Sequence, residues 1–289
     1  MPCSGPEPMA ETLEAPSHAV DLRGRVSLIC LETRNLDLAL NAIRRCTAHF
    51  RFEEIILFTD QDWSVGGMTV VRCEPIRSAK AYSKFMLGDF HRHVHTPHFL
   101  VVQWDGFVIH PERWRADFLA YDYIGAPWPH HDHAVGNGGF SLRSVRLHQA
   151  IDTLDKPECH PEDSFICLWN RPQLEAMGMR FAPYELAREF SAEADGYEAR
   201  PFGFHRFGNF NEAYDEPGLL AFLRAAPDAI VRSTEGRALL KNSLLLGRRD
   251  VVRELARRRL GGALRMRIDT LSILGRYGLQ RLFSRRASA

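Results

Sequence analysis

The sequence predicts an α/β fold, a Rossmann-type mixed sheet flanked by helices and followed by a C-terminal helical appendage. Two apolar, β-branched runs, residues 25–31 and 53–60, predict buried strands. Between them, residues 36–50 carry apolar side chains at helical spacing. Strand, helix and strand in this order form a right-handed parallel crossover. After Phe210 the composition changes and helix-like segments follow, which predicts the appendage.

The chain has 289 residues, enough for one large domain with an extension. We predict a leader over residues 1–22, an α/β domain over 23–212 and a basic helical extension over 213–289. The first segment contains Pro, Glu and Ser without the apolar core of a signal peptide, which favours a disordered leader. No run of about eighteen apolar residues occurs, so we expect no membrane span.

Charge and cysteine usage narrow the class of protein. The net charge is +1, which argues against nucleic acid as a partner. The six cysteines are scattered without C-x-x-C spacing. We interpret them as free, mostly buried thiols in a reducing compartment, which predicts a cytoplasmic protein.

Three further segments extend the sheet. Residues 68–73 predict a short strand, residues 79–93 a helix that carries Lys80 and Lys84, and residues 99–104 a buried strand. The polar loop formed by Glu32, Thr33 and Arg34 follows the first strand. Loops at the carboxyl ends of parallel strands face the binding crevice, so we expect this loop to bind a ligand.

The strand over residues 99–104 is followed at once by Asp105 and Gly106. A lone carboxylate at the end of a buried strand can hold a hard cation, because Mg²⁺ and Mn²⁺ take carboxylate oxygen and leave positions open for phosphate. Gly106 permits a tight turn beside it. The alternative interpretation is that Asp105 caps that turn.

The second half of the chain is less regular. The run His130, His131, Asp132 and His133 is either a metal cluster or a mobile polar loop, since adjacent side chains point in different directions. Asn137, Gly138 and Gly139 follow, and glycines here allow a close approach of the backbone to a ligand. The alternative is a plain turn before a strand. Residues 146–154 predict a helix.

Two later motifs also carry polar chemistry. Glu162 and Asp163 begin an amphipathic stretch, where acidic residues also favourably meet a helix dipole. His205 lies in a loop of glycine and aromatic residues, residues 201–210. A lone histidine is usually structural, but a late metal ligand would arrive in such a loop.

The order of these motifs resembles the nucleotide-sugar glycosyltransferases of the GT-A fold, and most of all the inverting beta-1,3-galactosyltransferase and fringe-like group. The segments QWDGF, GAPW, NGGFSLR, PEDSFIC and PFGFH also look like those of an uncharacterised bacterial glycosyltransferase-like group. The resemblance covers residues 25–210. It implies a GT-A-like fold, a nucleotide-sugar donor, a glycan or other hydroxyl acceptor, and Mn²⁺ or Mg²⁺ as cofactor.

The resemblance also implies roles for single residues. Asp105 matches the last Asp of the Asp-x-Asp motif, which binds the metal and through it the donor diphosphate, and His205 matches the late metal ligand. Gln103 replaces the first Asp of that motif, which leaves one carboxylate where two are usual. Asp163 matches the catalytic base, with Glu162 as its neighbour and substitute. The remaining expected contacts are with the donor (Glu32, Thr33, Arg34, Lys84, Gln103, Trp104, Asp105) and with the acceptor or sugar (Asn137, Gly138, Gly139).

The expected function is therefore an inverting, metal-assisted glycosyltransferase of polysaccharide biosynthesis. One alternative is a retaining transferase in which the acidic pair only shapes the pocket. Another is a sugar-nucleotide or carbohydrate-binding protein without catalysis, which the replacement at Gln103 motivates. A carboxylate suffices as base in inverting transfer, because the acceptor proton is lost only as the bond forms.

The extension is strongly basic. From Arg232 onward the chain has fifteen Lys or Arg and four Asp or Glu, with leucines interleaved among the arginines. A basic amphipathic stretch is typical of a membrane-surface or partner-binding element. The first option suits an enzyme that extends lipid-linked acceptors at the inner face of an anionic membrane. The alternative is a helical pair that packs on the catalytic domain and exposes a solvated basic face.

Overall fold

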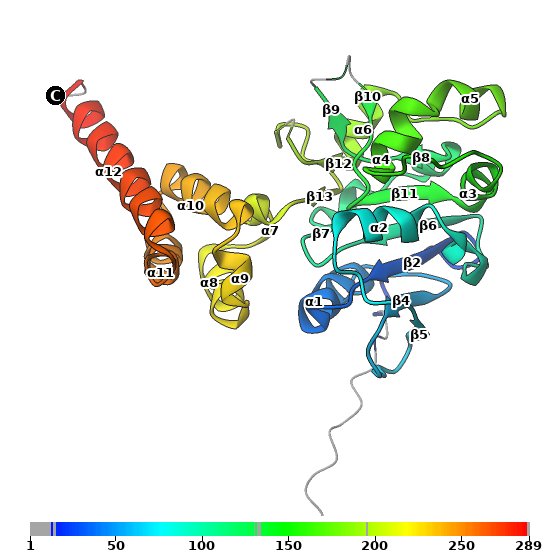
Figure 1. The fold of residues 1–289 in the computed structure, drawn as a ribbon, viewed down its shortest axis with the longest axis horizontal. Helices are drawn as coiled ribbons and strands as arrows, with labels where there is room; N and C mark the ends of the chain where they lie inside the picture. Colours follow the sequence, from blue (N-terminus) through cyan, green and yellow to red (C-terminus); the bar gives the residue numbers. More distant parts are fainter. Residues whose placement is uncertain (1–12, 14–15, 130, 132–133, 195, 288–289) are drawn as a thin grey trace, which may run out of the picture. The chain divides into compact units, whose positions relative to one another are not determined.

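The computed structural model describes residues 13, 16–129, 131, 134–194 and 196–287, with side chains described as far as residue 276. The chain divides into two compact units, residues 1–205 and 206–289, called here the sheet unit and the helical unit. Figure 1 shows the first in blue to green and the second in yellow to red.

The sheet unit is built on a six-stranded mixed sheet in the order β5–β4–β2–β6–β11–β8. The first four strands run parallel, and β11 is antiparallel to both of its neighbours. With helices on the sheet and a helical C-terminal part, the predicted fold class is confirmed (Figure 1). The strands are β2 (Val26–Leu31), β4 (Ile55–Thr59), β5 (Thr69–Arg72), β6 (His98–Val102), β8 (Tyr123–Ile124) and β11 (Ser141–Ser144).

The predicted parallel crossover is present as β2, α1 (Leu36–Thr47) and β4. Leu28 at the centre of β2 pairs with Ile55 on one side and Leu100 on the other, so β2 is buried among strands. The helix ends at Thr47, earlier than the predicted residue 50. The chain turns there into β3 (Phe50–Arg51), which pairs with β1 (Val20–Asp21).

Within the predicted leader the structure describes only residue 13 and residues 16–22. Leu13 is buried and its N–H donates to Gly66 O at 3.1 Å. Leu22 is also buried, and β1 pairs with β3. Packing on the sheet unit removes these apolar side chains from water, so the sheet unit includes this part of the predicted leader.

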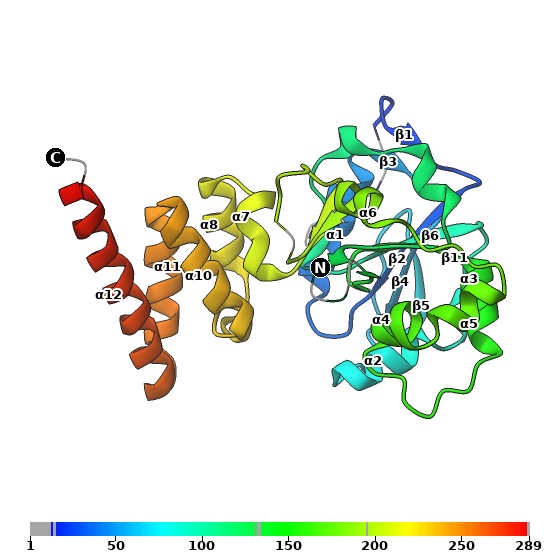
Figure 2. The ribbon, with the colours of Figure 1, turned by 90° about the horizontal axis from the view of Figure 1, so that it is seen from above.

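Apolar side chains fill both faces of the sheet, because successive strand residues point to opposite sides. Ile29, Phe58 and Phe99 pack against α2 (Ala79–Met86) and the 3-10 helix η1 (Asp89–His93) on one face. Helix α1 lies on the other face (Figure 2). The helix predicted over residues 79–93 is interrupted at Gly88, whose extended backbone separates α2 from η1.

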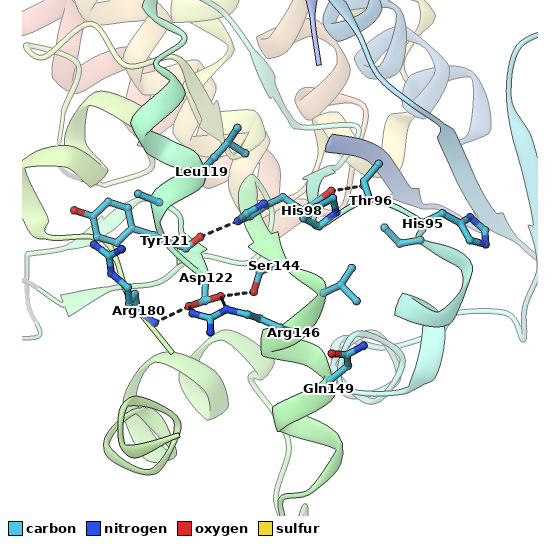
Figure 3. A pocket seen from close by; sticks show the side chains of 14 residues that line it. His95, Thr96, His98, Leu119, Tyr121, Asp122, Ser144, Arg146, Gln149 and Arg180 are labelled. Atoms are coloured by element: carbon cyan, nitrogen blue, oxygen red, sulfur yellow. Dashed lines mark hydrogen bonds and ion pairs between the residues drawn. The ribbon is translucent and has the colours of Figure 1, made fainter. Parts of the chain in front are cut away.

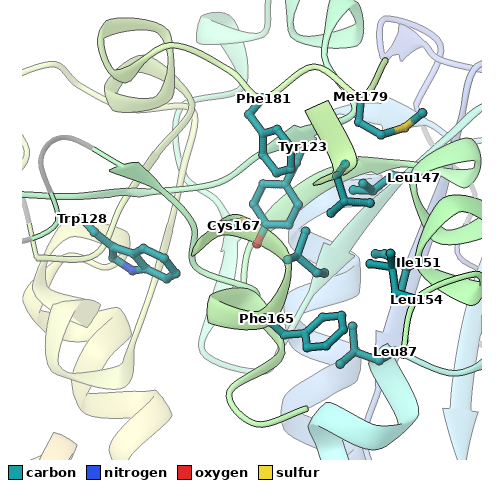
Figure 4. Packing of buried hydrophobic residues seen from close by; sticks show 12 residues of the cluster. Leu87, Tyr123, Trp128, Leu147, Ile151, Leu154, Phe165, Cys167, Met179 and Phe181 are labelled. Carbon is teal, nitrogen blue, oxygen red and sulfur yellow. The ribbon is translucent and has the colours of Figure 1, made fainter. Parts of the chain in front are cut away.

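A second cluster covers the β8 end of the sheet, as Figure 4 shows. The cluster includes Tyr123 of β8, Leu147 and Ile151 of α3 (Val145–Asp152), and Phe165 of a later π-helical turn. This cluster anchors the chain on both sides of the Glu162–Asp163 motif. The remaining elements of the sheet unit are η2 (Pro111–Arg113), η3 (Ala116–Ala120), β9 (Pro127–Trp128), β10 (Ala134–Val135), α4 (Glu162–Ser164), η4 (Phe165–Trp169), α5 (Arg171–Ala176) and α6 (Tyr184–Phe190).

A separate three-stranded sheet, in the order β12–β13–β7, brings distant parts of the chain together. Its strands are β7 (Gly106–Val108), β12 (Ser191–Ala192) and β13 (Gly203–His205). The pairing of β7 with β13 joins the residues after β6 to the end of the sheet unit.

The helical unit contains η5 (Phe207–Asn209), α7 (Phe210–Ala213), α8 (Glu216–Ala225), α9 (Asp228–Val231), α10 (Thr234–Leu246), α11 (Arg249–Leu260) and α12 (Leu264–Ala287). Its core consists of apolar side chains such as Leu223, Leu239 and Leu255, none of which is exposed. Among the described side chains of this unit, Arg258 and Arg259 are also buried. Across the described chain, no helix is long and apolar enough to cross a membrane.

Candidate functional site

Asp105 lies at the tip of a tight hairpin that closes the carboxyl end of β6. Gln103 and Gly106 exchange two backbone hydrogen bonds of 3.0 Å each, which leaves Trp104 and Asp105 as the turn. The Asp105 side chain is only 13% exposed. The predicted position of this carboxylate at a strand end is therefore what the structure shows.

His205 reaches Asp105 through strand pairing. In the antiparallel pair of β13 and β7, His205 stands opposite Gly106, the residue next to Asp105. His205 Nε2 is 3.7 Å from Asp105 Oδ1 and 3.2 Å from Gln103 Oε1. The two residues predicted as metal ligands thus meet although about one hundred positions separate them.

Glu193 stands on the other side of the same histidine. It follows β12, which runs parallel to β13, and its Oε1 is 3.3 Å from His205 Nδ1. This contact fixes the orientation of the imidazole and leaves Nε2 facing Asp105 and Gln103. Glu193 was missed in the sequence because it lies in a polar stretch, and only the β12–β13 pairing gives it a role.

The segment of Asn137, Gly138 and Gly139 lies against His205. The Asn137 Oδ1 accepts from Gly139 N at 2.9 Å, and Asn137 has a φ of 59°. A Cβ on Gly139 would lie 2.2 Å from His205 Nε2. Position 139 therefore has to be glycine for the imidazole to take its place beside Asp105.

Glu162 contacts the other glycine. A Cβ on Gly138 would lie 1.9 Å from Glu162 Oε1. That oxygen accepts from Arg143 Nη2 at 3.1 Å, and the same guanidinium donates to Gly138 O at 3.3 Å. The loop is therefore held between a buried ion pair and an imidazole.

Arg143 is fully buried in the middle of β11, and the Glu162 side chain is 7% exposed. Burial raises the pKa of Glu162, while the charge of Arg143 lowers it. Arg143 also lies over the ring of Tyr123, at 5.1 Å from its centroid. Arginine side chains in strands are expected to be exposed, so the sequence did not indicate that Arg143 is buried.

Tyr82 of α2 completes the buried polar group. Burial raises the pKa of its hydroxyl, and the neighbouring Glu162 raises it further, whereas the charge of Arg143 lowers it. Among the described residues, the Tyr82 hydroxyl, Asn137 Nδ2 and Arg143 Nη1 are buried without a hydrogen-bond partner. Buried polar atoms of this kind are usually satisfied by water or a ligand.

Asp163 differs from its neighbour Glu162. It lies in the single turn of α4 and is partly exposed, and its Oδ1 accepts from Ser164 N at 2.8 Å. The Glu162 N–H instead donates to Ser83 Oγ at 3.2 Å. The two acidic residues therefore differ in their surroundings. Glu162 is buried and paired with Arg143, whereas Asp163 is partly exposed.

The loop after β2 has structural contacts of its own. Glu32 Oε1 accepts from the N–H groups of Arg34 and Asn35 at the start of α1. Thr33 Oγ1 accepts from Ile76 N at 3.1 Å. Arg34 is exposed beside them, and Lys84 is exposed on α2. The structure thus shows how the Glu32 and Thr33 side chains are held, and it leaves both basic side chains open to solvent.

The histidine-rich run lies largely outside the described residues, which include His131 but not His130, Asp132 or His133. Within the described part of the chain, no group of three or more His, Cys, Asp or Glu side chains is arranged to hold a metal ion.

A cavity of about 410 Å³ lies at the opposite end of the sheet, where β6 begins (Figure 3). Its central carboxylate, Asp122, accepts from Ser144 Oγ, from Arg146 and from Arg180 N. These bonds connect the start of α3 to the segments that contain Asp122 and Arg180. Because protein donors already satisfy Asp122, we place the functional site at the Asp105 end of the sheet instead.

A family model described as "Protein of unknown function (DUF5672)" matches residues 68–205. No curated protein matches the chain. Among solved structures, a mannosyltransferase from Pyrobaculum calidifontis in complex with GDP-Man and Mn²⁺ is similar at 14% identity and a TM-score of 0.37, over 92% of this chain and 83% of that one.

Two further structures are similar over 63% of this chain. The apo-form glycosyltransferase GlyE of Streptococcus pneumoniae has 14% identity and a TM-score of 0.38, over 54% of its own length. A glycosyltransferase involved in glycosylation of the major capsid of PBCV-1 has 12% identity and a TM-score of 0.39, over 92% of its length. At such values the function has to be inferred from the residues themselves.

Proposed function

We propose that this protein is a glycosyltransferase that moves a sugar from a nucleotide-sugar donor to a hydroxyl acceptor. The observation that carries the proposal is the meeting of Asp105 and His205 against the Gly138–Gly139 loop, beside the Glu162–Asp163 pair. These groups gather at the carboxyl end of the parallel strands, where α/β sheets bind their ligands.

We propose that two of the residues present would ligate a divalent cation. A carboxylate and an imidazole, Asp105 and His205, would hold Mn²⁺ or Mg²⁺, with further positions left for phosphate and water. The Glu193 carboxylate on the other ring nitrogen is the partner that a metal-bound histidine usually has. When bound, the ion would neutralise charge on the leaving diphosphate.

The buried polar atoms at the site support a polar ligand. Asn137 Nδ2 and the Tyr82 hydroxyl could donate to sugar or ribose hydroxyls, and Gln103 could accept from one. For the nucleotide we assign the loops after β2 and β4, which contain Thr33 and Asp60. Among the described residues, Asp60 Oδ1 is buried without a hydrogen-bond partner, so a ribose or base donor would satisfy it.

We assign the catalytic base to Asp163 and not to Glu162. A base must accept a proton from the acceptor hydroxyl, so it has to be reachable. Asp163 is partly exposed, whereas Glu162 is buried and bonded to Arg143. Glu162 instead positions the glycine loop. Direct attack of the activated hydroxyl would invert the anomeric centre, so an inverting reaction is proposed.

The proposal is tested with the full chain and a panel of uridine, guanosine and cytidine nucleotide sugars, with and without Mn²⁺. Melting temperature reports binding and nucleotide release reports turnover. Asp105→Asn should lose both the Mn²⁺-dependent stabilisation and the turnover. Asp163→Asn should keep the stabilisation and lose at least a hundredfold in turnover, because a base acts in the transition state.

Asp89→Asn is the matched control, since this carboxylate is 77% exposed and lies outside the site. It should behave as the wild type in both measurements. Stabilisation by a nucleotide sugar without nucleotide release, even with glycan acceptors, would favour the binding-protein alternative. Full activity of Asp105→Asn in a chelator would show that the metal assignment is wrong.

A further inference from the structure

In the part of helix α12 whose side chains are described, one face packs on the helical unit and a row of apolar side chains on the other face is exposed. Ile273 and Thr270 are buried, and Asp269 pairs with Arg237 of α10 and Arg259 of α11. Leu264, Ile268 and Leu271 are 69%, 59% and 58% exposed. Because these three are spaced i, i+4 and i+7, they form one ridge on the side of the helix opposite to the buried residues.

An aligned row of exposed apolar side chains is an unusual feature of the described surface. The described residues include eight exposed large apolar side chains, of which five lie in the helical unit, and three of those form the ridge. Isolated exposed leucines are common, but aligned ones usually mark an interaction surface.

Basic side chains flank the ridge. Arg265 and Arg267 are exposed, and at 100° per residue they lie on opposite sides of the line through Leu264, Ile268 and Leu271. Among the described residues neither forms an ion pair. No acidic residue follows Asp269 in the sequence, whereas four more arginines do.

We propose that the outer face of α12 binds an anionic lipid surface, with the ridge lying in the headgroup region and the flanking arginines on the lipid phosphates. Helices that lie in a membrane interface have this arrangement. Their apolar stripe is bordered by long basic side chains, and the apolar stems of these side chains extend into the interface beside the stripe. This inference does not depend on the catalytic assignment.

Charge complementarity selects lipid over a second copy of the chain. Two copies of α12 packed ridge to ridge would bring their flanking arginines together. Among the described residues of α12 the one carboxylate is Asp269, which already pairs with Arg237 and Arg259. An anionic bilayer accommodates the apolar side chains and the arginines at once, each basic residue near the surface adding about 1 kcal/mol at low salt.

The test is co-sedimentation of the full chain with phosphatidylcholine vesicles that contain no or 30% phosphatidylserine. The wild type should sediment with the anionic vesicles at low salt and be released as salt rises. Leu264→Ser/Ile268→Ser/Leu271→Ser should bind at least about tenfold more weakly. Arg265→Gln/Arg267→Gln should bind about thirtyfold more weakly, from two basic residues at the value above.

Two matched controls separate position from composition. Arg253→Gln/Arg257→Gln removes the same charge from exposed arginines of α11, which pair with Asp250 and Glu254, and should weaken binding much less. Trp169→Ser/Met177→Ser removes exposed apolar side chains from the sheet unit and should bind as the wild type. Melting curves confirm that each variant is folded.

Three results would overturn the proposal. The wild type could fail to sediment with anionic vesicles at low salt, or the ridge variant could bind as well as the wild type. A lipid-free dimer in light scattering that the ridge variant abolishes would show that the occupant is a second copy.

Discussion

The substitution Arg143→Met would remove one half of the buried ion pair that supports the glycine loop. Arg143 is 0% exposed and its partner Glu162 is 7% exposed, with 3.1 Å between Nη2 and Oε1. The variant leaves a buried carboxylate without its cation, which typically costs about 3–5 kcal/mol. At about 2–4 °C per kcal/mol for a protein of this size, the melting temperature should fall by roughly 10 °C.

The stability lost in the Arg143→Met variant should depend on pH and should be larger at high pH. Burial raises the pKa of Glu162 above that of an unfolded chain. The folded state therefore binds a proton at Glu162 more tightly than the unfolded state does. The stability that this binding contributes is fully present below about pH 4.5 and is lost as pH rises through the folded pKa. Without Arg143 the folded pKa rises further, so the variant should be closer to the wild type at pH 5 than at pH 8.

The assay is thermal and urea unfolding at both pH values, with near-ultraviolet circular dichroism to follow the aromatic-rich sheet unit. Arg171→Met is the matched control, because its pair with Glu175 is partly exposed and should be worth under about 1 kcal/mol. Arg143→Met/Glu162→Leu should recover much of the lost stability, since it removes the isolated charge. A loss below 1 kcal/mol, or one that is equal at pH 5 and pH 8, would refute the reasoning.

Four further predictions concern other parts of the chain. Gly139→Ala should cost about 1–3 kcal/mol in unfolding titrations and displace His205, so its Mn²⁺-dependent melting shift should vanish while a shift with nucleotide alone remains. Glu193→Gln should weaken Mn²⁺ binding about ten- to a hundredfold in calorimetry, because the imidazole loses its orienting carboxylate. His148 is buried with both ring nitrogens unpartnered among the described residues, and burial lowers its pKa. Below about pH 6.5 the unfolded state therefore binds a proton at His148 that the folded state does not bind, and the wild type loses stability as pH falls. His148→Phe should lose less stability than the wild type between pH 7 and pH 5. Arg258→Met should lower the stability of the helical unit by about 2–3 kcal/mol in urea, since it removes donors to two buried carbonyls.

The sequence was sufficient for features that local patterns encode. The β2–α1–β4 crossover follows from apolar spacing, and Asp105 lies at a strand end because an apolar run stops there. The position of Asp105 at a sheet's carboxyl edge needs no knowledge of distant residues. His205 was reached only through a resemblance, since the pairing of β13 with β7 that brings it to Asp105 leaves no local signal.

Arg143 and Glu193 show why the rest of the site was not predictable. Each is an ordinary charged residue in its own segment, and its role depends on a partner brought near by tertiary structure. Arg143 is buried only because Glu162, nineteen positions later, supplies a carboxylate. Charged side chains are almost never fully buried unless paired, and a single sequence does not reveal the pair.

The arginines of the extension illustrate the same limit, with a consequence for its function. By composition they form one basic segment, but the structure divides them. Arg258 and Arg259 donate to backbone carbonyls of α8 and α9 and pair with Asp228 and Asp269. Such residues are part of the core, and their guanidinium groups are not available to a lipid surface. A lipid surface would therefore meet far fewer cations than the sequence suggests, and the apolar ridge of α12 has to supply much of the affinity. Release of the protein by salt should accordingly depend on exposed arginines such as Arg265 and Arg267 and not on the buried pair, and the ridge variant should be impaired even at the lowest salt.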